Sequence, residues 1–268
     1  MNEFVKNRFT ELQRKRMRSV INYIKSIGRT HDLTSLAKIY RVDKWGWHSY
    51  TPHYQHHLKK YRYRRINLLE IGAGGYDDIK AGGESLRMWK RYFPFGKIYS
   101  IDIYDKSFIE ENRIKIFKGS QVDDVFMQEV VKTDFDIIID DGSHINDHVI
   151  HTFKSLFPVL KDGGIYVIED VQTSYWPAFG GDSDNLNNPN TIMSFFKNLT
   201  DSLNYKEFIR PGYQPTYFDM NIVSMHFYHN LVFICKGKNI EESNLVQDNQ
   251  HIGYLKDPNS SIPDPVAR

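Results

Sequence analysis

The chain has 268 residues, of which 40% are hydrophobic and 25% are charged. These proportions are typical of a globular protein and exclude wholesale disorder, which needs low hydrophobicity and high net charge. No apolar run reaches the roughly 18 residues of a membrane span. The single cysteine, Cys235, excludes an internal disulfide framework and a multi-cysteine zinc site. We therefore expect a cytoplasmic protein, and by default an enzyme.

The net charge of +2 conceals an uneven distribution. Residues 1–30 hold eight Lys and Arg against two Asp and Glu, so this stretch carries +6 and the remaining residues carry −4. Phe4, Phe9, Leu12 and Met17 recur at roughly helical spacing, which predicts a basic amphipathic helix. Such a helix can bind a membrane or nucleic acid, but a solvated or subunit-packing helix is the commoner case.

A polar and aromatic segment follows from about residue 31 to residue 60 and includes DKWGWHSYTPHYQHH. It has no sustained period, so we expect a loop with short helical pieces that covers a site. His53, His56 and His57 suggest a metal cluster, but no cysteine completes a zinc site. Whether these histidines reach the active site is left open. The neighbouring KKYRYRR run is more typical of a solvated charged edge than of a nucleic-acid site.

Short apolar runs then alternate with candidate helices, which predicts an α/β fold with a mostly parallel sheet. The expected strands are 67–71, 98–103, 114–117, 135–140 and 164–169. The expected helices are 85–92, 124–132 and 145–157. Two further strands, 222–227 and 231–235, flank Tyr228-His229-Asn230 and predict an antiparallel C-terminal hairpin. We predict an N-terminal helical arm and cover loop (1–60), a catalytic domain (61–240) and a polar C-terminal tail (241–268).

A glycine turn, Gly72-Ala73-Gly74, follows the first strand and would let a ligand approach the backbone closely. A dinucleotide fingerprint requires a third glycine, and Asp77 stands at that position. The pattern is instead Glu-x-Gly-x-Gly from Glu70, which suits a ligand without a diphosphate. Asp102, at the end of the second strand, is placed to accept both ribose hydroxyls, although an Asp there can also merely cap a turn.

Four carboxylates, Asp140, Asp141, Glu169 and Asp170, follow the fourth and fifth strands. If these strands are neighbours or next neighbours, the four groups lie close together and repel one another, so a cation is their natural partner. Oxygen ligands suit a hard ion such as Mg²⁺. The alternative is that these acids cap helices and turns. His144, three residues after Asp141, would serve as a general base beside a metal.

These residues resemble a family. The Glu-x-Gly-x-Gly turn with Asp102 is similar to the S-adenosylmethionine site of class I methyltransferases, whose Rossmann-like sheet also ends in antiparallel strands. The segment from Leu36 to Lys236 resembles the metal-dependent O-methyltransferases that modify sugars of macrolide antibiotics. The motifs that carry this second resemblance are DKWGWHSYTPHY, LLEIGAGGY, GGESLRMW, IDDGSH, GGIYVIEDVQTSYW and SMHFYHN.

The resemblance implies a role for each residue. The implied cofactor-binding residues are Glu70, Gly72, Gly74, Asp102, Gln121 and Asp140, with Gln121 near the adenine. The implied Mg²⁺ ligands are Asp141, Glu169 and Asp170, and His144 is the implied general base. The sulfonium methyl of S-adenosylmethionine would pass in line to a sugar hydroxyl.

The leading hypothesis is therefore a Mg²⁺- and S-adenosylmethionine-dependent O-methyltransferase that acts on a sugar hydroxyl of a glycoside, natural product or nucleotide-linked sugar. The alternatives are an NAD-dependent oxidoreductase and a non-enzymatic module that binds nucleotides or nucleic acid. We expect a small sugar-containing substrate, no membrane, no nucleic acid, and a homo-oligomer as an open question. Trp45, Trp47, Tyr175 and Trp176 are candidates for stacking on a sugar, or for packing alone.

Overall fold

The computed structural model describes residues 11–75, 78–243, 246–247 and 250–251. The chain forms two compact units, Met1–Ser143 and His144–Arg268. Each unit is described by itself.

The first unit is built on parallel strands in the order β3-β2-β1-β4. Their bounds are β1 Asn67–Ile71, β2 Lys97–Asp102, β3 Ile114–Lys118 and β4 Phe135–Asp140. Ile71 pairs with Ile101 of β2 and with Asp140 of β4. The carboxyl ends of these three strands are therefore level, which is where open parallel sheets bind ligands.

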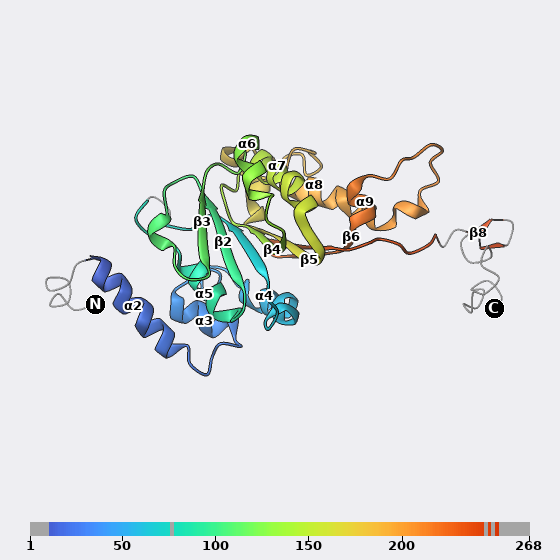
Figure 1. Cartoon of the computed structure of the whole chain (residues 1–268). Coiled ribbons are helices and arrows are strands. Elements are labelled where there is room, and N and C mark those ends of the chain that lie inside the picture. The colour runs from blue at the N-terminus through green and yellow to red at the C-terminus, as the bar shows by residue number, and fades with distance from the viewer. Residues whose placement is uncertain (1–10, 76–77, 244–245, 248–249, 252–268) are drawn as a thin grey trace. The chain divides into compact units, whose positions relative to one another are not determined.

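Helices of the first unit connect these strands or precede them (Figure 1). They are α2 Glu11–Lys25, α3 Leu33–Tyr40, α4 Thr51–Leu58, η1 Lys59–Tyr61, α5 Glu84–Tyr92, η2 Ser107–Ile109 and α6 Asp124–Val130. Asp32 and Asp123 begin α3 and α6 by accepting hydrogen bonds from backbone N–H groups of the first turn. α3 lies beside α5, so the segment predicted as a cover loop packs against the βαβ layer through a helix.

The second unit combines helices with an antiparallel set of strands, ordered β5-β7-β6. The strands are β5 Leu160–Glu169, β6 Ile222–Tyr228 and β7 Leu231–Lys236, followed by the short pair β8 Val246–Gln247 and β9 Gln250–His251. The helices are α7 Asn146–Leu156, η3 Phe157–Val159, η4 Val171–Tyr175, η5 Pro177–Phe179, α8 Ile192–Asn198, η6 Leu199–Glu207 and α9 Tyr217–Asn221.

Hydrophobic burial explains why these segments form strands and helices. Residues 137–139 of β4 and 231–234 of β7 are fully buried. Phe153 of α7 is also fully buried, and its ring lies 5.1 Å from that of Tyr166 on β5 and 4.9 Å from that of Phe196 on α8. These aromatic contacts hold α7 and α8 against the strands of the second unit.

The predicted fold class is confirmed: the seven strands form a mixed sheet, mostly parallel with an antiparallel C-terminal hairpin. The strand predicted at 164–169 begins earlier, at Leu160. The prediction missed its first residues because Lys161, Asp162 and Gly163 are exposed, so the sequence shows no apolar run there. The 31–60 segment contains the two short helices α3 and α4, as its mixed pattern predicts.

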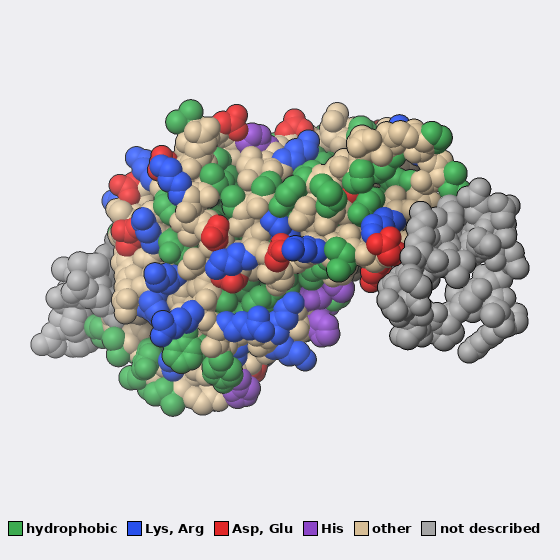
Figure 2. Space-filling model, turned by 45° about the vertical axis from the view of Figure 1, so that its right-hand side comes forward, with side chains coloured by type: hydrophobic (Ala, Val, Ile, Leu, Met, Phe, Trp, Pro, Cys, Tyr) green, Lys and Arg blue, Asp and Glu red, His purple; other side chains and the backbone are tan. Residues whose placement is uncertain are grey.

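The predicted basic helix is present as α2, although Phe4 and Phe9 lie outside the described residues. Several of its apolar side chains are exposed, including Val20 at 59% and Ile24 at 59%. Figure 2 shows that exposed hydrophobic side chains and a gathering of Lys and Arg side chains share the lower half of one face of the molecule. Most of the predicted C-terminal tail lies outside the described residues.

Candidate functional site

The glycine turn leaves the carboxyl end of β1 in a conformation that only glycine adopts easily. Gly72 has φ +90° and Gly74 has φ +73°. The N–H of Gly72 donates to the carbonyl oxygen of Ile101 at 2.9 Å, which ties the turn to β2. A Cβ on Gly72 would overlap the carbonyl oxygen of Asp141. The turn therefore exposes backbone, rather than side chains, at the edge where a ligand would approach.

Asp102 ends β2 and holds this turn in place. Its Oδ2 accepts from the N–H of Ala73 at 3.1 Å, and its Oδ1 accepts from the N–H of Tyr104 at 2.8 Å. The second bond is the turn cap that the sequence offered as the alternative role. The bond from Ala73 places the Asp102 carboxylate directly beside the glycine turn. Asp102 therefore caps the turn after β2 and also lies where a ligand would bind.

Lys106 is a site residue that sequence reasoning missed. Its side chain is 1% exposed, and its Nζ donates to the carbonyl oxygens of Gly74 at 3.0 Å and Ala81 at 2.8 Å. The ammonium thus ties the glycine turn to Ala81. The neighbours of Lys106 in the sequence are acidic and polar, as they are for a solvated lysine. No sequence signal distinguishes a buried lysine from a solvated one at this position.

Gln121 and Asp140 also lie at this edge of the first unit. Gln121 is 6% exposed, and its Oε1 accepts from the N–H of Ser143 at 3.1 Å. Gly142 lies so close that a Cβ there would overlap the same oxygen. Asp140 is the last residue of β4 and is 1% exposed. Gln121 therefore holds the backbone of Ser143 in place after β4, two residues beyond Asp141, the predicted metal ligand.

Glu70 is completely buried in β1. Its Oε2 accepts from the hydroxyl of Ser85 at 2.7 Å, and its Oε1 accepts from the indole N–H of Trp89 at 3.1 Å. Burial raises the pKa of Glu70, and the nearby ammonium of Lys44 opposes that rise. The carboxylate thus ties β1 to α5 from inside the fold.

Lys44 is the second residue that the sequence did not single out. It is 1% exposed, and its Nζ lies 2.6 Å from Oδ2 of Asp141 and 3.3 Å from Oε1 of Glu70. Asp141, by contrast, has a side chain that is 24% exposed. A buried ammonium therefore links an interior carboxylate to the predicted metal ligand that follows β4.

The second unit carries the remaining predicted site residues. His144 has φ +56° and Asp170 has φ +54°, both in the left-handed region that non-glycine residues seldom adopt. His144 Nε2 lies 3.7 Å from Asp170 Oδ2, with the two side chains 25% and 18% exposed. Glu169, the last residue of β5, is 3% exposed. Two unusual backbone conformations thus bring an imidazole and a carboxylate together.

The histidines and tyrosine of α4 have other surroundings. His57 is 8% exposed, and the rings of His56 and His57 meet edge to face at 4.9 Å. Burial lowers the pKa of His53, and His56 lowers it further. Among the described residues, no group of three potential metal ligands includes any of the three. Tyr54 is fully buried, with its ring 5.1 Å from that of Trp89, so it belongs to the core.

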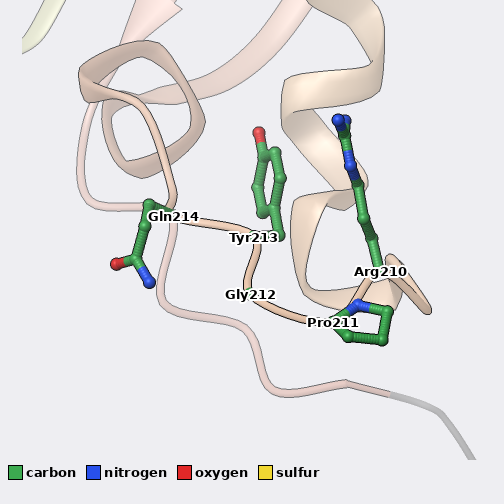
Figure 3. A pocket seen from close by; sticks show the side chains of 5 residues that line it. All are labelled: Arg210, Pro211, Gly212, Tyr213 and Gln214. Carbon is green, nitrogen blue, oxygen red and sulfur yellow. The ribbon is translucent and has the colours of Figure 1, made fainter.

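A separate surface pocket in the second unit is lined by one loop, Arg210 to Gln214 (Figure 3). The side chains of Arg210 and Tyr213 lie roughly parallel there, and the Tyr213 hydroxyl donates to Asp219 at 2.6 Å. None of the predicted site residues lines this pocket. No helix in the described part of the chain is long and apolar enough to cross a membrane.

Known proteins are similar to this chain in sequence and in fold, although no family model matches it. Mycinamicin VI 2''-O-methyltransferase of Micromonospora griseorubida is 46% identical over 217 residues, which are 80% of this chain and 54% of that protein. Demethylmacrocin O-methyltransferase of Streptomyces fradiae is 49% identical over 214 residues, which are 78% of this chain and 54% of that protein. The chain thus spans about half the length of these relatives.

A solved structure agrees with the sequence matches. The MycE methyltransferase from the mycinamycin biosynthetic pathway, in complex with Mg and S-adenosylhomocysteine (SAH), is 46% identical and superposes with a TM-score of 0.76. The match covers 79% of this chain and 56% of that one.

The sheet, the glycine turn and these matches define a methyltransferase fold of class I. Within this class, the chain is a homologue of the macrolide and sugar O-methyltransferases. The resemblance predicted from the sequence is confirmed. These relatives support neither the oxidoreductase nor the nucleic-acid alternative. Asp77, which stands in place of the third glycine of a dinucleotide fingerprint, lies outside the described residues.

Proposed function

We propose that the chain is an S-adenosylmethionine- and Mg²⁺-dependent O-methyltransferase that acts on a sugar hydroxyl of a glycoside, natural product or nucleotide-linked sugar. The observation that carries this proposal is its 41–49% identity to named O-methyltransferases. Two of these relatives are named for rhamnosyl tetracenomycin compounds and one for an olivosyl compound, which favours a deoxysugar as the acceptor.

The residues at the carboxyl edge of the first unit are suited to hold the cofactor. Gly72 and Gly74 present backbone to it, and Asp102 would accept the ribose hydroxyls while it holds the turn. Gln121 would lie near the adenine. Bound there, the cofactor supplies the methyl group.

Glu70, next to the last residue of β1, and Asp140, the last residue of β4, are both buried at this edge of the first unit, where they would support the bound cofactor. We propose that Asp140 contacts the cofactor. Glu70 fixes the glycine turn through its hydrogen bonds to α5.

Asp141, Glu169 and Asp170 are the proposed Mg²⁺ ligands. Carboxylate oxygens are the donors that this ion prefers, and Asp141 already accepts a cationic group, the ammonium of Lys44, at 2.6 Å. The relative with 46% identity was solved with Mg, which supports the same choice of ion. When bound, Mg²⁺ supplies charge stabilisation and lowers the pKa of a hydroxyl that it binds.

His144 is the proposed general base. Its Nε2 would take the proton from the acceptor hydroxyl, since imidazole titrates near neutral pH. Asp170 Oδ2 lies 3.7 Å from the same nitrogen, so its negative charge would stabilise the imidazolium that forms. Trp47, which is 83% exposed, and Trp176, which is 49% exposed, are available to stack on a sugar, a role that stays a prediction.

The test is a screen of nucleotide-linked and glycoside-bound deoxysugars with S-adenosylmethionine, which measures SAH release with Mg²⁺ and with EDTA. We expect release only in the presence of both an acceptor and the metal. A purified chain that binds neither S-adenosylmethionine nor SAH in calorimetry would contradict the proposal. A cytoplasmic location and the division into arm, catalytic domain and tail stay predictions from the sequence.

A further inference from the structure

We infer that Lys44 is a positioning residue for Asp141: the buried ammonium holds this carboxylate in the orientation in which it binds Mg²⁺. The inference rests on the proposed function and adds to it a residue outside the ligand set. The observation behind it is the pair of distances from Lys44 Nζ, 2.6 Å to Asp141 and 3.3 Å to Glu70, in a side chain that is 1% exposed.

An ammonium so deeply buried needs an opposite charge beside it, because the free energy of removing a charge from water is larger than that gained from most single contacts. Glu70 provides it from inside the fold and is itself fixed by Ser85 and Trp89 of α5. The backbone of Lys44 is fixed as well, since its carbonyl oxygen accepts from the N–H groups of residues 50 and 51 at the start of α4. Lys44 is therefore anchored at both ends of its side chain.

Asp141 is the exposed end of this chain of contacts. It directly follows β4, and its side chain is 24% exposed, so it is the member of this chain of contacts that solvent and a metal ion can reach. The ion pair to an anchored ammonium selects one orientation before any metal arrives. Groups that orient a metal ligand in this way typically contribute about 10–100-fold to metal affinity.

Charge and positioning predict opposite effects when Lys44 is replaced. Removal of a positive charge beside Asp141 should, by Coulomb's law, make the site bind Mg²⁺ more tightly. Loss of the anchor should make it bind more weakly, because the ligand must then be ordered at the expense of binding energy. The direction of the change therefore separates the two roles.

The experiment titrates the full chain with MgCl₂ in a calorimeter, for the wild type, Lys44→Met and Glu70→Gln. We expect Lys44→Met to bind Mg²⁺ about 10–100-fold more weakly. Glu70→Gln, which keeps the ammonium but loosens its anchor, should show a smaller loss in the same direction. SAH affinity, measured in parallel without metal, should stay close to the wild-type value in Lys44→Met. Lys236→Met is the matched control, because Lys236 is 4% exposed but donates to the carbonyl oxygens of residues 157 and 158 in the second unit.

Unchanged or tighter Mg²⁺ binding by folded Lys44→Met overturns the inference. If that variant does not fold, as judged by circular dichroism, Lys44→Gln, which removes the same charge but keeps a polar side chain, takes its place, and unchanged or tighter Mg²⁺ binding in it overturns the inference in the same way. A wild-type chain that binds neither Mg²⁺ nor SAH contradicts the proposed function instead, so the two failures are distinguishable.

Discussion

Gly72 has a left-handed backbone conformation and lies close to the backbone of Asp141. With φ +90° and no room for a Cβ beside the Asp141 carbonyl, Gly72→Ala should distort the turn that Asp102 holds. We expect the variant to lose most of its SAH affinity in calorimetry and to be less stable. Gly163→Ala is the matched control, because Gly163 has φ +78° but nothing within 4 Å of its Cβ position.

The control isolates the cost of the backbone conformation, which is about 1–2 kcal/mol for a left-handed residue with a Cβ. Gly163→Ala should show this cost in its unfolding free energy and retain SAH binding. If Gly72→Ala binds SAH as well as Gly163→Ala does, the close approach at Gly72 has no bearing on the cofactor.

His144 is the residue on which the proposed proton transfer depends. His144→Ala should abolish SAH release while leaving SAH affinity unchanged, because His144 is not one of the proposed cofactor residues. The backbone at this position has φ +56°, which Asn adopts more readily than Ala, so His144→Asn removes the imidazole with less strain. Turnover that persists in either variant, measured at saturating Mg²⁺, would remove His144 as the base.

Gly74 and Ala81 are tied together by one buried side chain, that of Lys106. Lys106→Met preserves the length and apolar stem of the side chain but removes the donor to both carbonyl oxygens. We expect SAH affinity to fall by about tenfold or more, since a hydrogen bond from a charged donor is worth about 1.5–3 kcal/mol and Gly74 would no longer be tied to Ala81. Lys236→Met, the equivalent change far along the chain, should lower the melting temperature and leave SAH affinity intact.

The α9 segment is stabilised at its start by a capping box in which Thr216 and Asp219 bond to each other's backbone N–H groups. Burial raises the pKa of Asp219, but hydrogen bonds from Tyr213 and Thr216 outweigh it, so the pKa is lowered overall. A lowered folded-state pKa means that the stabilisation is present above the unfolded value of about 3.9 and is lost as the pH falls through the folded value.

Asp219→Asn should therefore cost about 0.5–2 kcal/mol near neutral pH, the usual value of an N-terminal cap interaction, and less below about pH 4. Urea unfolding of the wild type and the variant across this range is the measurement. Asp201→Asn, which changes an exposed carboxylate of η6 in the same unit, is the control. A difference between wild type and Asp219→Asn that does not shrink in acid would contradict the assignment.

At the scale of the whole molecule, the parallel strands were predictable because each is an apolar run followed by turn residues, and Gly72 and Asp102 mark strand ends by their chemistry. Lys44 and Lys106 were not predictable. Both are buried lysines within polar segments, and a single sequence does not separate a lysine that donates to the interior from one that faces water. Partners far apart in the chain, such as Lys44 and Asp141, become visible only once the fold brings them together.

The proposed roles divide along the chain: the cofactor residues lie between positions 70 and 140, whereas His144, Glu169 and Asp170 belong to the second unit. A change confined to the second unit should then separate cofactor binding from metal-dependent turnover. Asp170→Asn is the sharpest such change, because Asn tolerates the φ of +54° and keeps the size of the side chain.

We expect Asp170→Asn to bind SAH like the wild type, to require more Mg²⁺ for half-maximal SAH release, and to turn over more slowly even at saturating metal, since the negative charge beside the His144 imidazole is also lost. Asp162→Asn, an exposed carboxylate of β5, should match the wild type in all three measurements. Weakened SAH binding in Asp170→Asn would show that the cofactor and metal functions are not separable along the chain. An unchanged Mg²⁺ requirement would instead remove Asp170 from the ligand set and leave Asp141 and Glu169 as its members.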